Sequence, residues 1–389
     1  MEIIWIGIAL VLAAVGYAVF RKPAARASVA APSGSVRGNS QSLRVSMPTA
    51  AAYVPLDIVL PGPVERPKVA PVGLTSYEPL HADTLTGDRK QFFVNTFKDV
   101  PRPPKLLHHL LSPDFVGTAS SAELEDLIVG EPLIAAKVLA TVNSPLFGLK
   151  TQVRSIGQAV SLLGLNSVRS VCLQYILIAS FKADSAGRER ILDGTGKASA
   201  LASELIQQLS LKLSLPDQGA LVSAVVLSFL GRLATAATMP NMVLATIPTH
   251  DLLDRASAEQ QALGLSSSEI GRLLMLDWEL PRKIVEDAAD IDWVLVTPGD
   301  TADAIDPVRR SRLALCYLCA RLGERLAEGE LEDLSRFDLA SETGADYFQV
   351  WSYFDEARIV RLGEIFRAPE VNASLQKMLR AMREPDVVV

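Results

Sequence analysis

The 389-residue chain has few of the residues and motifs from which several classes of active site and scaffold are built. It has three cysteines, Cys172, Cys316 and Cys319, and all three stand in apolar sequence. That is too few for a disulfide framework, so the main body is expected in a reducing compartment, which points to the cytosol. The chain also has no glycine-rich phosphate loop and no Gly-x-Ser-x-Gly elbow, so nothing indicates a P-loop site or a serine hydrolase.

A zinc site is not expected from the cysteines. Cys316 and Cys319 have the C-x-x-C spacing in "LALCYLCARLG", which inside a helix places both on one apolar face. No second Cys or His pair is available to complete a tetrahedral site, so we expect two buried small side chains.

Histidine is scarce too, with four in the chain. The dipeptide His250-Asp251 in "PTHDLLD" lacks a preceding apolar run, and a Thr249 helix cap with Asp251 in the first turn explains the local sequence. The others, which lie near the end of a linker and on a short early helix, are His81, His108 and His109. We expect no metal site built from these residues, and no cofactor.

The first segment predicts a retained membrane anchor. Residues 3–20 are eighteen residues without a charge, about 27 Å long as a helix and close to the hydrocarbon thickness of about 30 Å. A signal peptide would begin with a basic region, whereas here Glu2 leads and Arg21 and Lys22 follow. Because Lys and Arg stay on the cytoplasmic side, we expect a single pass through the inner membrane within residues 1–22, with the N-terminus outside and the main body cytoplasmic.

A disordered linker rich in Pro, Ala and Ser is predicted over residues 23–90. Five basic residues and no acidic one lie between positions 21 and 56, which either hold the linker near an anionic inner leaflet or serve only as the orientation signal. The whole chain has a formal charge of −6, and with Glu2 and those five basic residues set aside, the chain from residue 57 onward carries −10. An acidic body argues against binding nucleic acid, which needs clustered cations.

The body from residue 91 follows the helical period and shows no alternating strand pattern, which predicts an all-α bundle. Capping boxes at Ser120 to Glu123 and at Ser155 to Gln158 mark two helix starts, and Asn166 is expected to cap a third helix. Later helices are expected over residues 196–213, 217–236, 257–263, 267–277, 281–289, 304–327, 345–354, 358–366 and 369–382.

Two linked motifs carry a resemblance to a known family. "EPLIAAKVLATVNSPLFGL" and "VRSIGQAVSLLGLNSVRSVCL" closely resemble the HDOD family, with its acidic-Pro start, Asn-Ser helix end, aromatic-Gly turn, "SI..A...LG" helix and "..VR.L" helix in this order. Further on, "EQQALGLSSSEIGRLLMLDWELP" resembles the family's second signature. The matching positions are Glu131, Pro132, Asn143, Ser144, Phe147, Gly148, Ser155, Ile156, Ala159, Leu163, Gly164, Val168, Arg169, Glu259, Gly264, Glu269, Ile270, Gly271, Leu274, Trp278, Leu280 and Pro281. The resemblance implies an HDOD or HD-like helical domain over residues 91–300.

Four residues in and beside the first motif form a candidate partner surface: Asn143, Phe147, Arg154 and Arg169. A structural role explains them as well. Asn143 could take a left-handed conformation at a helix end, Phe147 could plug the helix pair from the turn, and Gly148 could supply a positive φ. The two arginines could simply belong to a solvated helix face.

HDOD proteins resemble the HD-domain phosphohydrolases in fold, which implies where a catalytic site would lie. A metal-dependent member needs a His-Asp pair on a buried helix and further His or Asp residues, because a divalent cation must be held while it polarises water and phosphate. In "VVLSFLGRLA" the glycine aligns with the one after that pair, so Ser228 and Phe229 take the His and Asp places. Ser267 stands where a His is often seen before "EIG". We therefore expect neither a metal nor catalysis at these degenerate positions.

The resemblance implies a membrane-tethered, non-catalytic scaffold or regulator in bacterial signalling that acts through protein–protein interaction, with signalling proteins as its partners. Two alternatives stay open. In one, the degenerate pocket binds a cyclic or other small nucleotide without hydrolysis. In the other, the chain is a metal-dependent phosphohydrolase, which needs ligands that the sequence does not supply.

Residues 301–389 extend past both motifs and are expected to form a helical extension packed on the HDOD domain. Their stretch "DYFQVWSYFDEARI" holds five aromatic residues, which form either core or a partner surface. We favour core, because aromatic residues at helical spacing usually face inward.

Overall fold

The computed structural model describes residues 69–98, 100–145, 147–149, 151–248, 251–299, 306–342 and 344–383. The predicted membrane helix within residues 1–22 and the predicted linker up to residue 68 lie outside the described residues. The last part of that linker is folded, in contrast to the prediction. It holds α2 (Val72–Ser76) and the 3₁₀ helix η1 (Ala82–Thr84), and α3 (Gly87–Phe97) begins before residue 90.

Every regular element in the described residues is helical, as the sequence predicts. The first group comprises α4 (Lys105–Leu111), α5 (Pro113–Thr118), α6 (Ser121–Val129), α7 (Pro132–Val142), α8 (Ile156–Leu163) and α9 (Leu165–Ala179). The middle group comprises α10 (Ala186–Lys212), α11 (Gln218–Ser228), α12 (Leu230–Thr238), α13 (Asn241–Leu244), α14 (Leu252–Leu263), α15 (Ser267–Asp277), α16 (Arg282–Ala289) and η2 (Ile291–Leu295). The last group comprises α17 (Pro307–Glu328), η3 (Leu339–Ser341), α18 (Ala345–Phe348), η4 (Val350–Tyr353), α19 (Glu356–Arg367) and α20 (Pro369–Arg383).

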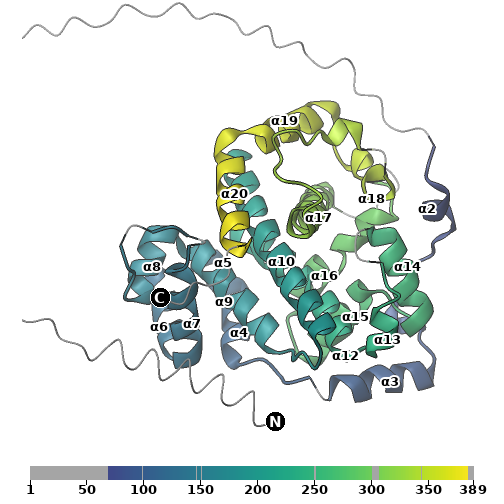
Figure 1. Cartoon of the computed structure of the whole chain (residues 1–389), viewed down its shortest axis with the longest axis horizontal. Coiled ribbons are helices and arrows are strands. Elements are labelled where there is room, and N and C mark those ends of the chain that lie inside the picture. The colour runs from purple at the N-terminus through teal and green to yellow at the C-terminus, as the bar shows by residue number, and fades with distance from the viewer. Residues whose placement is uncertain are drawn as a thin grey trace, which may run out of the picture. The chain divides into compact units, whose positions relative to one another are not determined.

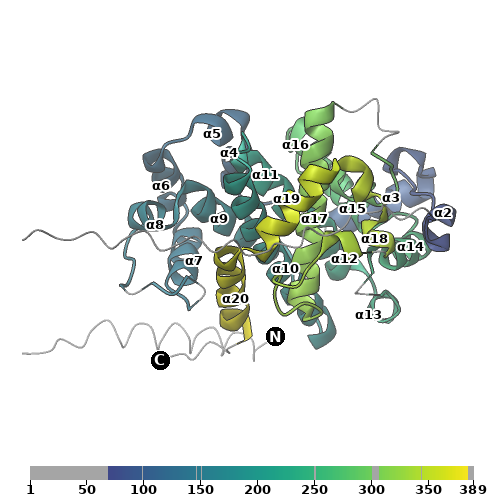
Figure 2. The same ribbon diagram turned by 90° about the horizontal axis from the view of Figure 1, so that it is seen from above.

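The longest described helix, α10, belongs to the middle group. It packs along α17 of the last group and also contacts α9 of the first group (Figure 1). It begins ten residues before the predicted start at 196, because Ser185 caps it by accepting the N–H of Arg188. The contact with α17 is close because Gly323 has no side chain: a Cβ there would lie 2.6 Å from the carbonyl oxygen of Ala198. In two perpendicular views, α6, α7 and α8 gather on one side of α10, and α13, α14 and α15 lie on the other (Figure 2).

One predicted helix is broken in two. The sequence predicts a single helix over residues 217–236, whereas α11 ends at Ser228 and α12 begins at Leu230. The Ser228 hydroxyl donates to the carbonyl oxygen of Val225 at 2.8 Å, a local bond that competes with regular helix pairing. Phe229 stands at the junction and is 3% exposed, so the break lies inside the protein.

α12 and α15 cross at two glycines. A Cβ on Gly231 would lie 1.8 Å from the carbonyl oxygen of Ser267, and one on Gly271 would lie 2.9 Å from the backbone nitrogen of Gly231. Packed atoms never come so close, so only glycine permits the crossing. The crossing brings the first residue of α15 beside the α11–α12 junction.

The helix-start predictions are partly confirmed. Ser120 and Glu123 form the expected capping box with both hydrogen bonds. Ser155 caps α8 by accepting the N–H of Gln158, but the Gln158 side chain accepts from the backbone of Arg154, so no box forms.

Two further local predictions differ from the structure. Asn166 lies inside α9, because Gly164 turns the chain with a φ of +84° and the helix already begins at Leu165. The helix expected over residues 345–354 is divided into α18 and η4, since the backbone changes to a 3₁₀ helix after Gln349.

The C-terminal aromatic residues belong to the core, as favoured. Their exposed fractions are 4–7%, and they are Tyr347, Phe348, Trp351, Tyr353 and Phe354. The expectation that the cysteines are buried is also confirmed. Burial raises the pKa of Cys172 and of Cys316 to about 12, which keeps both as thiols at neutral pH.

By length and composition, one stretch of the described chain is apolar enough to cross a membrane, namely Gln218–Thr238. It comprises α11 and α12, and 78% of its apolar window is buried inside the protein. The core helices of soluble domains commonly share this composition, so the stretch carries no evidence for a membrane span.

Replacing Gly231 with alanine should destabilise the protein by about 3 kcal/mol, because α12 and α15 must separate to admit the Cβ. Chemical denaturation of the full chain, followed by circular dichroism, measures this loss. The control is Gly194→Ala in α10, where an added Cβ meets nothing within 4 Å. That change should be neutral or stabilise by up to about 1 kcal/mol. Equal midpoints for Gly231→Ala and the wild type would contradict the tight crossing.

Candidate functional site

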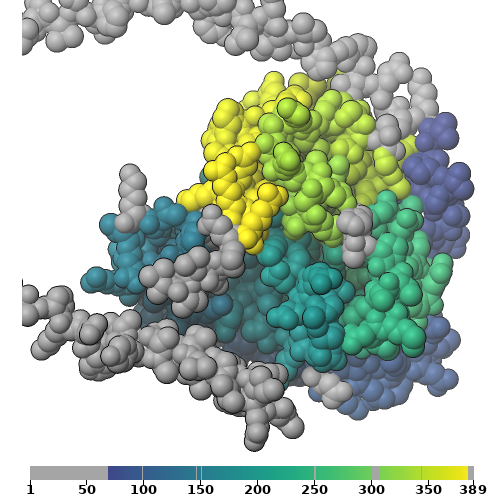
Figure 3. All heavy atoms as spheres, viewed as in Figure 1, coloured from purple at the N-terminus to yellow at the C-terminus, as the bar shows by residue number. Residues whose placement is uncertain are grey.

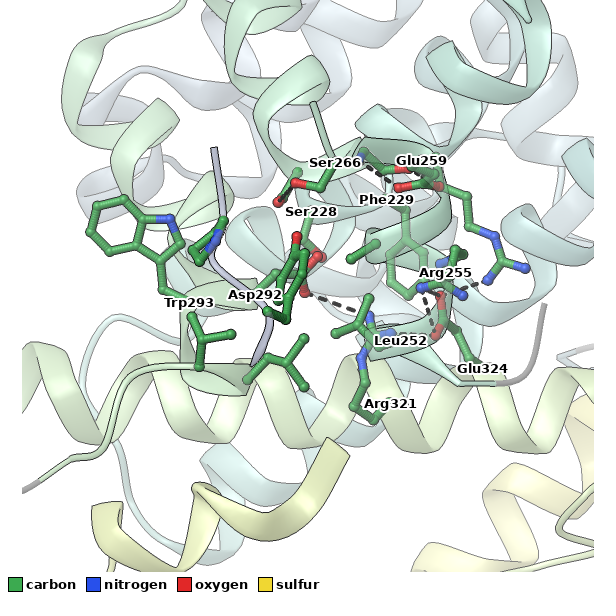
Figure 4. A pocket seen from close by; sticks show the side chains of 18 residues that line it. Ser228, Phe229, Leu252, Arg255, Glu259, Ser266, Asp292, Trp293, Arg321 and Glu324 are labelled. Carbon is green, nitrogen blue, oxygen red and sulfur yellow. Dashed lines mark hydrogen bonds and ion pairs between the residues drawn. The ribbon is translucent and has the colours of Figure 1, made fainter. Parts of the chain in front are cut away.

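A small cavity, the central cavity, lies where the α11–α12 junction, α14, α15, η2 and α17 meet (Figure 4). Its volume is about 30 Å³. Ser228, Phe229 and Ser267 all line it, so the structure brings together the three positions that sequence comparison singled out. The glycine crossing of α12 and α15 accounts for this proximity.

The three side chains present no set of metal ligands. Ser228 donates its hydroxyl hydrogen to Val225, and Phe229 offers a ring without a lone pair. Ser267 donates to Glu259 twice, from its hydroxyl at 2.5 Å and from its N–H at 2.7 Å, so Glu259 acts as a cap for α15. Within the described residues, no three His, Cys, Asp or Glu side chains lie close enough together to bind a metal ion.

An ion network forms one wall of the cavity. Glu324 on α17 accepts hydrogen bonds from Arg232 at 2.6 Å, Arg255 at 3.0 Å and Arg321 at 2.5 Å. These four side chains, here named the Glu324 network, are between 5% and 12% exposed. Arg321 also lies 3.6 Å from Asp292, which lines the cavity from η2 (Figure 4).

Burial and charge act in opposite directions on the carboxylates. Burial alone would raise the pKa of Glu324, but the charges of the three arginines outweigh it and lower that pKa to about 2. Burial raises the pKa of Asp292 and of Glu259, against the opposing charges of nearby arginines. Glu324 is therefore the firmly ionised centre of the site.

A strap formed by residues 77–84 closes one side of the cavity. Tyr77 and Pro79 line the cavity directly. The Gln260 side chain clamps the strap backbone, since its Oε1 accepts the N–H of Leu80 at 2.7 Å and its Nε2 donates to the carbonyl oxygen of Glu78 at 2.8 Å. Burial, followed by the charges of Glu259 and Asp292, raises the pKa of Tyr77 to about 12.

The strap is fixed at a second point, on α15 and η2. The N–H of Ala82 donates to Glu269 at 3.0 Å, and the His81 ring meets the Trp293 ring edge-on at a centroid distance of 5.2 Å. His81, predicted near the end of a linker, is thus part of the strap. In the sequence, the strap follows α2 and the segment that is predicted to connect the chain to the membrane.

The comparisons with known proteins agree with this helical architecture. A family model for the HDOD domain matches residues 100–292. The chain contains an HDOD domain. HDOD domains are non-catalytic relatives of the HD domains. No curated protein matches the chain.

Solved structures show the fold beyond the HDOD domain. An HDOD domain protein of unknown function from Geobacter sulfurreducens is 17% identical, with a TM-score of 0.51 over 76% of this chain and 98% of its own. A protein from Marinobacter aquaeolei VT8, provisionally described as a signal transduction protein, is 18% identical with a TM-score of 0.51, over 76% of this chain and 65% of its own. One from Shewanella amazonensis SB2B, provisionally described as a phosphohydrolase, is 17% identical over 75% and 97%, but its TM-score of 0.47 supports no inference.

Arg169 does not lie on a surface, so it cannot belong to the candidate partner surface. It is fully buried, and its Nη2 donates to the carbonyl oxygen of Gly219 and to the Ser223 hydroxyl. Burial lowers its pKa to about 10. Gly219 leaves room for the guanidinium, since a Cβ there would lie 2.9 Å from Nη1. Arg169 therefore joins α9 to α11 within the core.

The other three candidate residues surround one turn. Asn143 ends α7 in the right-handed region, with a φ of −84°, and not in the predicted left-handed conformation. Its side chain bonds the backbone of Val153 twice, at 2.7 and 2.8 Å, which closes the turn. Gly148 has the expected positive φ of +53°. Phe147 is half-buried and Arg154 is exposed, so these two stay available to a partner.

The remaining histidine predictions have mixed outcomes. His108 and His109 lie on the short helix α4, as expected. Asp251 is itself the cap of α14 and accepts the N–H of Asp254 at 2.9 Å, whereas Thr249 and His250 lie outside the described residues.

The Glu324 network and the strap were not predicted. Arg321 and Glu324 stand three positions apart within the apolar stretch "LALCYLCARLGERLAEG", and charges inside such a run signal paired burial. Arg232 and Arg255 carry no comparable local signal, because their partner lies on a helix at least 69 residues away.

Replacing Glu324 with glutamine should destabilise the protein by about 3–5 kcal/mol, because three buried cations lose their shared anion. Because the folded pKa of about 2 lies below the ordinary 4.5, this contribution is present above pH 4.5 and is lost as the pH falls toward 2. Denaturant midpoints measured across that pH range test both statements. The control is Glu364→Gln, whose exposed pair with Arg361 should be worth less than about 1 kcal/mol. Similar losses of unfolding free energy for the two variants would contradict the inference that Glu324 is a buried anion shared by three arginines.

Replacing Gln260 with alanine should speed hydrogen exchange at the Leu80 amide about tenfold, because the strap loses both bonds of its clamp. Hydrogen exchange with mass spectrometry on residues 77–84 measures the change. Gln261→Ala is the matched control, since the neighbouring side chain is exposed and makes no bond to the strap. If both variants exchange at the wild-type rate, the clamp does not hold the strap.

Proposed function

We propose that the chain is a membrane-tethered, non-catalytic HDOD protein that acts in signalling by binding partner proteins. The observation that carries this proposal is the set of side chains that line the central cavity. At the positions aligned with a catalytic His-Asp pair stand a serine and a phenylalanine, and the adjoining wall is the Glu324 network.

The chemistry of these residues disfavours phosphoester hydrolysis. A hydrolytic metal centre needs several nitrogen and carboxylate donors with free lone pairs. Here Glu324 is already bonded to three guanidinium groups and Glu259 caps α15. A cation entering there would also have to displace Arg232, Arg255 and Arg321 from the oxygens of Glu324.

The volume of the cavity disfavours the alternative in which a nucleotide binds without hydrolysis. Small-molecule sites typically measure about 300–1,000 Å³. The central cavity offers about 30 Å³, and the strap covers it. A nucleotide could enter only after the strap and some of the Glu324 network had moved.

The tether supports an inner-membrane location as part of the same proposal. An uncharged run of eighteen residues precedes a basic segment, which favours one membrane pass with a cytoplasmic body. The strap then connects that tether to the HDOD domain.

Purified full-length chain should contain less than about 0.1 equivalent of Mn, Fe or Zn after incubation with each metal, and should not hydrolyse cyclic dinucleotides, because its donors are already used. Elemental analysis and a phosphodiesterase assay measure both. In parallel, crosslinking in cells should attach specific proteins to the full chain.

Stoichiometric metal with activity that chelation abolishes would overturn the proposal. So would crosslinking that recovers no protein above the level seen with an unrelated membrane-anchored control. Heat from titration with a cyclic dinucleotide, without product, would favour the nucleotide-binding alternative.

A further inference from the structure

A second and much larger hollow, the α9–α10 groove, lies away from the central cavity. Its volume is about 760 Å³, and its walls come from α7, α8, α9, α10 and α20. Figure 3 shows the yellow C-terminal part of the chain lying against the teal part that contains α10. Residues of α20 in this yellow part line the groove.

The walls of the groove expose apolar side chains. Leu211 is 61% exposed, Leu162 53% and Ile178 38%. Phe147, the half-buried member of the candidate partner surface, lines the same groove. Exposed leucines grouped in one concave surface are typical of a binding site.

The polar floor of the groove is already satisfied. Ser170 and Ser203 share a hydrogen bond of 2.9 Å, and the Gln174 side chain donates to both. Ser167 donates to Gln207 at 3.0 Å. An occupant therefore need not supply polar groups to the floor, and burial of its apolar side chains would provide the binding energy.

The charges of the groove favour an acidic occupant. Lys137 is exposed and makes no hydrogen bond or ion pair with the residues that the structure describes. Lys377 also lines the groove and contacts the carbonyl oxygen of Phe147. Arg380 extends the exposed basic face of α20 by one turn. The acidic group in the lining, Glu204, already accepts bonds from Gln208 and Ser374.

Lys137, Lys377 and Arg380 form a basic rim, which contrasts with the rest of the protein because residues from 57 onward carry a formal charge of −10. A cationic patch on an acidic body attracts anionic segments and orients them at the groove. The same acidity disfavours a second copy of the chain as the occupant.

We propose that the α9–α10 groove binds an acidic amphipathic helix of a signalling partner, with the apolar face of that helix against Leu162, Ile178 and Leu211. This is recognition of a helix in a groove, in which residues spaced three and four apart serve as anchors. The proposal rests on the proposed function, since it names the surface and the partner chemistry through which the scaffold acts.

Two fluorescent helical peptides test it, identical in their leucine face and carrying either glutamates or lysines on the other face. Anisotropy with the full chain should show binding of the acidic peptide and binding of the basic one at least about tenfold weaker. Leu211→Asp should weaken the acidic peptide about tenfold or more, and Lys137→Glu about fivefold with a reduced salt dependence.

Matched controls lie far from the groove. Met242→Asp changes an 83% exposed residue on α13, and Lys90→Glu reverses an exposed charge on α3. Both should leave the affinity unchanged. Circular dichroism of the Leu211→Asp variant should match that of the wild type, which shows that weaker peptide binding is not caused by unfolding.

Other results would overturn the proposal. Equal binding of the basic peptide would remove the charge argument, and unchanged binding by Leu211→Asp would place the site elsewhere. Self-association that Leu211→Asp abolishes would assign the groove to a second copy. Tighter peptide binding after deletion of residues 384–389 would assign it to the chain's own C-terminal segment. If the peptide fails while cellular crosslinking still recovers partners and no turnover is found, the groove assignment falls and the scaffold function stands.

Discussion

The Glu324 network is the interaction on which the rest of the site depends. One carboxylate on α17 accepts hydrogen bonds from guanidinium groups on α12, α14 and α17 itself, so three helices meet at a single buried anion. Removing charges from water costs several kcal/mol for each ion, and only close pairing offsets that cost. The pairing therefore fixes α17 against α12 and α14. It also places three arginines in the wall of the central cavity, beside Ser228 and Phe229.

Steric constraint complements this electrostatic one. Gly231 and Gly271 allow α12 and α15 to cross at contact distance, and Gly323 does the same for α10 and α17. These crossings set the distance between the helices that carry Arg232, Ser267 and Glu324. The strap then covers the remaining opening, held by the Gln260 clamp and by Glu269. Packing and ion pairing together leave about 30 Å³, which explains why the site presents a filled interior and not a ligand pocket.

The sequence predicted what depends on local pattern. Helical periodicity gave the all-α class, the Ser120 capping box and the α15 boundaries, and the motif resemblance identified the HDOD domain. Features that depend on distant partners were missed. Arg169 looked like a helix-surface residue because its burial depends on Gly219 and Ser223, fifty positions or more away. The break at Phe229 was missed because the apolar run continues through it. The strap was assigned to the linker because its order comes from contacts with α14 and α15, not from its own composition.

The filled cavity and the open groove have one physical explanation. A chain that satisfies its buried charges internally cannot use them on a ligand, so binding has to rely on surfaces where apolar side chains and cations stay exposed. The α9–α10 groove has both, whereas the central cavity measures about 30 Å³ and the arginines of the Glu324 network are already paired. α10 links the two sites: α12 and α17, which line the central cavity, pack on it, and so do α9 and α20, which line the groove. The Glu324 network pairs α12 with α17, and both helices pack on α10, so the network also supports the helix that forms one wall of the groove.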